Sequence, residues 1–123
     1  MPLDLNAVRA LALDFPGVEE GTCFGTPAFY VRKKFLGRVR EDGESYAMPI
    51  ASIAERTRLL DEQPDVFFHE PHYENYAMVL LNLSAASGAI FRRLFERAWR
   101  ARATKKAIAA YEAGAAPPGA ASR

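Results

Sequence analysis

The first part of the chain has the pattern of an amphipathic helix. Apolar residues recur at helical spacing between Leu5 and Ala12, with polar residues between them. Pro16 and Gly17 follow directly, and this pair is typical of a helix end. We therefore expect a helix that starts after Asp4 and ends before Pro16.

A β-like region follows the first helix. The predicted strands cover residues 22–24, 28–32, 35–40 and 45–48, after a loop over 17–21 and with a turn at 25–27. Asp42 and Gly43 lie between the last two strands, and this pair readily takes the positive φ values of a tight turn. The pattern predicts a hairpin closed by residues 41–44.

The middle of the chain predicts a helix and a second β unit. Ser52 and Glu55 form a capping box, in which the serine accepts from a first-turn amide and the glutamate reaches back to the serine amide. A helix over residues 53–63 follows. We expect a short strand at 66–68, an irregular connection, and a strand at 77–83 that is buried on both faces.

The C-terminal part predicts two more helices. After Ser87, a wide apolar stripe includes Phe91, Phe95 and Trp99, whose helical spacing predicts core positions. Thr104 is a candidate N-cap for a shorter helix over residues 105–112.

The composition fits one compact domain. Half of the 123 residues are apolar, which is enough for one core. The predicted class is α+β, with an antiparallel sheet of five or six strands. Two hairpin-like units flank the middle helix, and the N- and C-terminal helices pack on the sheet. We expect one domain over residues 1–113 and a disordered tail over 114–123, which is rich in small residues, proline and glycine.

The N-terminus and the single cysteine favour a cytoplasmic protein. Cys23 has no partner for an intramolecular disulfide. Asp4 and Arg9 interrupt the apolar run that a signal peptide would need. The apolar runs are far shorter than the roughly 20 residues of a membrane span, so we expect no membrane role.

Five stretches carry a resemblance to a known family. They are LALDFPGVEEGT, FGTPAF, LGRVREDGE, FFHEPHY and FERAWRARATKKAIAAYE. In this order and spacing, over residues 5–112, the chain resembles the MmcQ/YjbR family. The resemblance implies a small α+β domain similar to the CyaY-like, double-wing arrangement, with DNA binding and no established reaction. One position departs from it, because Pro49 stands where family members often carry a lysine.

Basic residues of the hairpin and of the C-terminal helices are the first candidate site. They are Arg32, Lys33, Lys34, Arg38, Arg40, Arg97, Arg100, Lys105 and Lys106. If the two segments meet, they can bind DNA weakly through its phosphates, in a salt-sensitive and largely sequence-neutral way. Arg38 and Arg40 share a face because strand side chains alternate. The alternative is that these charges are only the solvated sides of amphipathic elements, and the sequence leaves both open.

The HEPHYENY segment is the alternative site, for a protein or small-ligand partner and without nucleic acid. Its candidate contacts are His69, His72, Tyr73 and Tyr76. Two histidines supply too few ligands for a zinc site, so we expect no metal. Cys23 is expected to be a small buried hydrophobe, and we assign no catalytic residue. The glycines match no phosphate loop or dinucleotide fingerprint, so no cofactor is expected.

Overall fold

The computed structural model describes residues 3–115 of the chain. In chain order, the elements are α1 (Leu5–Leu13), β1 (Val18–Cys23), β2 (Thr26–Val31), β3 (Lys34–Val39), β4 (Ser45–Pro49), α2 (Ile53–Glu62), β5 (Phe67–Phe68), the 3-10 turn η1 (Pro71–Tyr73), β6 (Met78–Asn82), α3 (Gly88–Arg102) and α4 (Lys105–Ala115). No helix within this range has the length and apolar content needed to cross a membrane.

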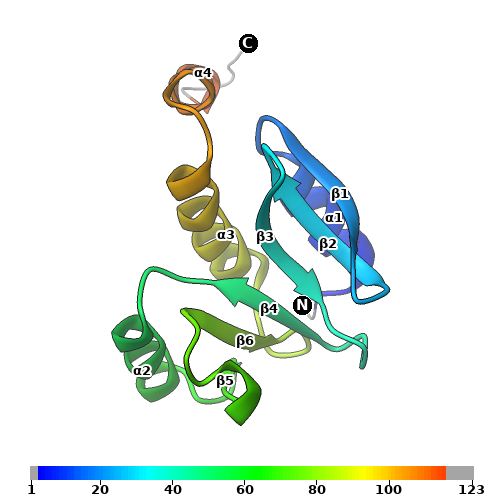
Figure 1. Cartoon of the computed structure of the whole chain (residues 1–123), viewed down its shortest axis with the longest axis vertical. Coiled ribbons are helices and arrows are strands. Elements are labelled where there is room, and N and C mark those ends of the chain that lie inside the picture. The colour runs from blue at the N-terminus through cyan, green and yellow to red at the C-terminus, as the bar shows by residue number, and fades with distance from the viewer. Residues whose placement is uncertain (1–2, 116–123) are drawn as a thin grey trace.

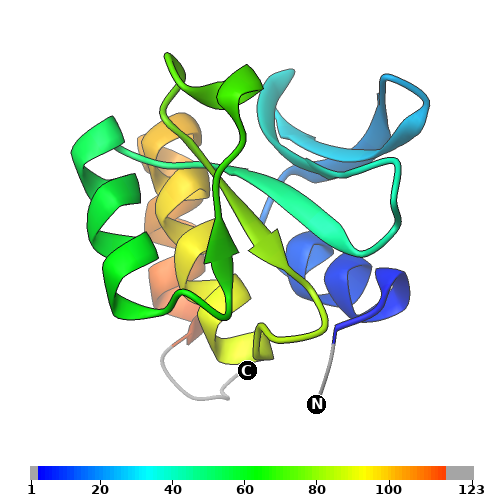
Figure 2. The same ribbon diagram turned by 90° about the horizontal axis from the view of Figure 1, so that it is seen from below.

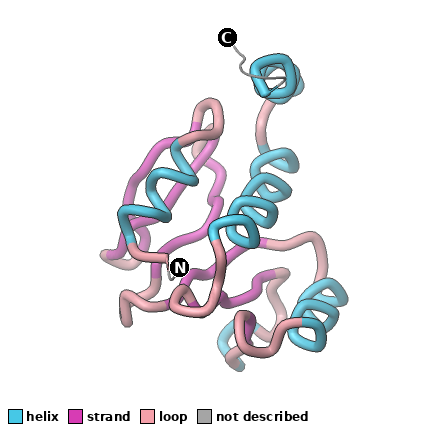
Figure 3. The backbone as a smooth tube through the Cα atoms, turned by 180° about the vertical axis from the view of Figure 1, so that it is seen from behind, coloured by secondary structure: helices cyan, strands magenta, loops and turns pink. Residues whose placement is uncertain are grey.

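The six strands form one antiparallel sheet in the order β1-β2-β3-β4-β6-β5. The first four strands follow one another as a meander, and α2 then connects β4 to the short edge strand β5 (Figure 1). Helices α1 and α3 lie over one face of the sheet (Figure 3). The predicted α+β class, with an antiparallel sheet and helices packed around it, is confirmed.

Two element boundaries differ from the prediction by three residues or more. Residues 18–21, expected in a loop, belong to β1, where Glu20 accepts two hydrogen bonds from Arg9 of α1 at 2.7 and 3.0 Å. Pairing of the whole of β1 with β2 outweighs the weak strand propensity of the segment. At the other end, α4 continues to Ala115, past the expected end at residue 112. The rest of the predicted disordered tail, residues 116–123, lies outside the described residues.

Side-chain caps begin the helices where the sequence predicts. Ser52 accepts from Glu55 N at 3.1 Å, and Thr104 accepts from Ala107 N at 3.0 Å. The Glu55 carboxylate accepts from Ala51 N at 3.0 Å, where the capping box predicted the serine amide. Each cap satisfies amides that have no partner inside the helix.

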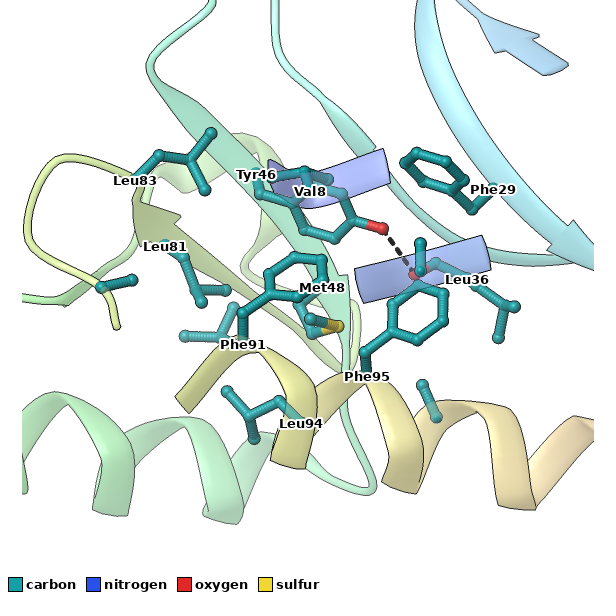
Figure 4. Close-up of a cluster of buried hydrophobic side chains, with 14 of the residues drawn as sticks. Val8, Phe29, Leu36, Tyr46, Met48, Leu81, Leu83, Phe91, Leu94 and Phe95 are labelled. Atoms are coloured by element: carbon teal, nitrogen blue, oxygen red, sulfur yellow. Dashed lines mark hydrogen bonds between the residues drawn. The ribbon is translucent and has the colours of Figure 1, made fainter. Parts of the chain in front are cut away.

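Aromatic side chains of α3 form the centre of the core between the sheet and the helices (Figure 4). Phe91, Phe95 and Trp99 are fully buried, as predicted. The rings of Phe91 and Phe95 stack with centroids 5.6 Å apart, and Tyr46 of β4 meets Phe91 edge-on at 5.0 Å. Burying these large rings is the main source of stability, at about 25 cal/mol per Å² of apolar surface.

Gly37 lets β3 approach β4 closely at a bulge in the sheet. Its φ is +116°, and the β2–β3 register shifts between Ala28 and Tyr30. A Cβ at this position would meet the ring and hydroxyl of Tyr46 and would lie 2.5 Å from the Ala47 carbonyl oxygen. Tyr46 in turn donates to the Leu36 carbonyl at 3.0 Å (Figure 4), and burial raises the pKa of its hydroxyl well above the ordinary value.

Asp42 stabilises the β3–β4 turn. Its carboxylate accepts from Glu44 N at 2.8 Å, Ser45 N at 3.0 Å and the Ser45 hydroxyl at 2.9 Å. Burial alone would raise the pKa of Asp42, but these hydrogen bonds outweigh it and lower the pKa below 3.8. Gly43 has a φ of +71°, as the predicted Asp-Gly turn requires.

Replacing Gly37 by alanine should destabilise the protein strongly. We expect a loss of about 3 kcal/mol or more in the free energy of unfolding, because positive φ and overpacking add up. Gly43→Ala is the matched control, since Gly43 also has positive φ but open space around its Cα. It should cost only about 1 kcal/mol. Urea unfolding of both variants measures the difference. Equal losses in the free energy of unfolding would contradict the close approach of β3 to β4 at Gly37.

Asp42→Asn should lower stability by about 1 kcal/mol at pH 7, the scale of a few partly exposed hydrogen bonds. Because the folded pKa of Asp42 is depressed, its contribution is present above the unfolded pKa and is lost as the pH falls through the folded value. The gap between wild type and variant should therefore close as the pH falls below the unfolded value of about 3.9 and through the lower folded value. Asp61→Asn, at an exposed position of α2, removes the same charge and should give no such gap in pH-dependent urea unfolding.

Candidate functional site

The sheet face opposite α1 and α3, called here the outer face, carries Arg38 and Arg40 of the predicted basic set. Phe29, Leu36 and Tyr46 point into the core, so the residues that alternate with them point the other way. The bulge in β3 brings Phe35 and Arg38 to the same face, because the register changes between them.

Segment 69–77, which contains η1, lies against this outer face next to the cyan strands in Figure 2. Arg40 forms an ion pair of 2.7 Å with Glu70, and its guanidinium lies 6.0 Å from the Tyr73 ring centroid. Arg38 reaches the Tyr73 hydroxyl at 3.5 Å. The two candidate sites of the sequence analysis are therefore in direct contact.

Arg56 of α2 holds segment 69–77 in place. Its Nη1 donates to the carbonyls of Tyr73, Tyr76 and Met78 at 2.8, 3.0 and 3.3 Å, and its Nη2 donates to Glu74 O at 2.9 Å. The residue is only 5% exposed. A buried charge is expensive unless it is well hydrogen-bonded, so these four carbonyls and the guanidinium stabilise one another.

A pocket of about 180 Å³ opens between the β1–β2 turn and η1. It is lined by Cys23, Phe24, Phe35, Arg38, Ala47, His72, Tyr73 and Met78. Cys23 lies at its rim and is half-buried, which is less burial than expected for a small core hydrophobe. The β1–β2 turn has positive φ at both Phe24 and Gly25, which leaves the phenyl ring exposed.

The other alternative-site residues differ in exposure. His72 and Tyr76 are exposed, while Tyr73 is half-buried. His69 is half-buried, and its Nδ1 has no hydrogen-bond partner among residues 3–115. Across those residues, no three His, Cys, Asp or Glu side chains are grouped to hold a metal ion.

Four of the nine predicted phosphate contacts lie within ion-pair distance of carboxylates. Besides Arg40, Arg38 lies 3.4 Å from Glu41. Arg97 lies 2.6 Å from Glu55, and Arg100 lies 2.7 Å from Glu112. The sequence could not predict these pairs, because most join residues that are distant along the chain.

The other five predicted contacts form a group that we call the basic end. It consists of Arg32, Lys33, Lys34, Lys105 and Lys106. The β2–β3 turn and the α3–α4 junction both lie at the upper end of the molecule in Figure 1, and Arg32 Nη1 donates to the Arg102 carbonyl at 3.2 Å. None of the five forms an ion pair with another described residue.

Sequence reasoning missed Arg56 and Phe24. A signal for Arg56 exists, since it lies three and four residues before Leu59 and Leu60, on the apolar side of its helix. Phe24 gave no such signal, because an aromatic residue in a β-like run is usually assigned to the core.

Comparisons of the chain with family models, with curated proteins and with solved structures gave no match. The resemblance to the MmcQ/YjbR family stays a prediction.

Arg56→Met should release segment 69–77. We expect the free energy of unfolding to fall by about 3 kcal/mol, because four carbonyls lose a charged donor. Chymotrypsin should then cut faster at Tyr73 and Tyr76. Arg58→Met is the control on the same helix, since Arg58 is half-exposed and makes only two long ion pairs, of 3.3 Å with exposed Glu62 and of 3.4 Å with Glu55, which also pairs with Arg97. It should change stability by about 0.5 kcal/mol at most. Similar cleavage rates in both variants would rule out the anchoring role of Arg56.

Proposed function

We propose that the protein binds double-stranded DNA weakly, without catalysis, through the basic end. The observation that carries this proposal is the contact between Arg32 and the Arg102 carbonyl, which brings two basic segments 70 residues apart to one place. Phosphate binding needs several cations within reach of one backbone, and the contact between the two segments supports such a grouping of the five side chains.

The backbone of the β2–β3 turn supports a role for its side chains. Arg32 and Lys33 have φ values of +54° and +65°, so both take the conformation that two-residue hairpin turns usually fill with Asn-Gly. Each non-glycine residue in this region costs about 1 kcal/mol or more. Basic residues that occupy strained positions at an exposed tip favour a function for their charge.

The expected binding is electrostatic and sequence-neutral. Five phosphate contacts would give a slope of log K against log salt of about −4.5. Lys105 and Lys106 lie in the first turn of α4, whose helix dipole is positive at that end and adds to the same potential.

The MmcQ/YjbR resemblance points in the same direction, since it implies DNA binding by a CyaY-like, double-wing domain without an established reaction. The single cysteine, which has no partner for an intramolecular disulfide, fits a reducing compartment such as the cytoplasm for this function.

The proposal is tested with a fluorescent 20-base-pair duplex and anisotropy titrations between about 20 and 200 mM salt. The wild type should bind at low salt and lose affinity steeply as salt rises. Lys33→Gln/Lys105→Gln removes one charge from each segment and should reduce the steepness of the salt dependence by about 2.

The matched control is Arg58→Gln/Arg93→Gln, which removes the same charge from exposed positions of α2 and α3. It should keep the wild-type salt slope. Absence of binding by the wild type at low salt, or equal effects of the two double variants, would overturn the proposal.

A further inference from the structure

The pocket beside η1 contains a nearly buried cation that has no close anionic partner among the described residues. Arg38 is 7% exposed. Its guanidinium lies 3.2 Å from the Thr26 hydroxyl, 3.5 Å from the Tyr73 hydroxyl and 3.4 Å from Glu41. A charge with so little water around it is stabilised best by a close, desolvated anion.

Arg40, which directly follows the end of β3, has a close carboxylate partner. Its ion pair with Glu70 is 2.7 Å long. In contrast, the only carboxylate within ion-pair distance of Arg38 in the described chain belongs to Glu41, whose side chain is 64% exposed. Water screens such an exposed partner, so it neutralises Arg38 weakly. The planar fork of the guanidinium can donate two parallel hydrogen bonds to a carboxylate.

The walls around Arg38 are largely aromatic and apolar. Phe24 is 80% exposed, and the Arg38 guanidinium lies 5.2 Å from its ring centroid. Phe35 and Met78 line the pocket with it. Phe24 has a φ of +53°, an unusual conformation for a phenylalanine, and it places a large ring in solvent at the pocket mouth. An apolar group that covered this ring would gain from its burial.

We propose that this pocket binds a small aromatic carboxylate, with its carboxylate on Arg38 and its ring against Phe24, Phe35 and Met78. The volume of about 180 Å³ is below that of pockets for drug-sized ligands, so it fits a single ring with a short anionic group. One cation favours a monoanion over a phosphate dianion. The Tyr73 hydroxyl, which accepts from the guanidinium, lies beside it as a further donor.

This inference is independent of the DNA proposal. The pocket lies at the β1–β2 turn and the basic end lies at the β2–β3 turn, which are opposite ends of strand β2. If the test of one proposal fails, the other proposal is therefore not affected.

Benzoate is the test probe, measured by ligand-observed NMR and by calorimetric titration of the full chain. We expect a dissociation constant on the order of 1 mM, as for a small ligand with one charged contact and one buried ring. Benzamide lacks the charge and acetate lacks the ring, so each should bind at least about tenfold more weakly. Inorganic phosphate tests whether the pocket is a general anion site. Phosphate binding as tight as that of benzoate would overturn the proposal.

Phe24→Ala and Arg38→Gln separate the two halves of the site. Phe24→Ala changes an exposed side chain, so it should leave the midpoint of thermal unfolding unchanged and weaken the binding of benzoate about tenfold. Arg38→Gln should remove the preference for benzoate over benzamide. Arg58→Gln, on α2, should leave benzoate binding unchanged. No detectable binding of benzoate to the wild type at about 10 mM, or equal binding to wild type and Phe24→Ala, would overturn the proposal.

Discussion

Arg56 is the residue on which the outer face of the sheet depends. Its guanidinium donates to four carbonyls of residues 73–78, of which Tyr73 O and Tyr76 O also accept a backbone amide and Glu74 O and Met78 O lie beside them. Because the side chain comes from α2, it fixes the segment to the body of the domain. This interaction helps to place η1, whose Tyr73 contacts Arg38, and the adjacent Glu70, which pairs with Arg40.

The anchored segment decides which cations are available for binding. Arg40 is neutralised by Glu70, and Arg38 becomes the base of a small pocket with aromatic walls. The basic end lies at the far end of β2, where no described carboxylate lies within ion-pair distance. One hairpin thus carries two different electrostatic environments, an exposed group of charges and a nearly buried single charge. They suit a polyanion and a small monoanion respectively.

The sequence predicted the architecture better than the site. Two kinds of local pattern predicted the structure correctly, namely the helical stripe of Phe91, Phe95 and Trp99 and the caps Ser52 and Thr104. Such patterns are reliable where the packing of the core favours the same conformation. The grouping of charges was not local. Arg97 meets Glu55 across 42 positions, and Arg40 meets Glu70 across 30, so the pattern of basic residues alone overstated the patch. The positive φ of Phe24 likewise depends on how β1 pairs with β2.

The anchoring by Arg56 can be observed directly by NMR of arginine side chains, with Arg56→Lys used for assignment. Four carbonyl acceptors should stop rotation of the guanidinium, so separate and slowly exchanging Nη signals are expected for Arg56. Half-exposed Arg58 on the same helix should give averaged signals in the same spectrum. An Arg56 guanidinium that rotates and exchanges as fast as that of Arg58 would contradict the account.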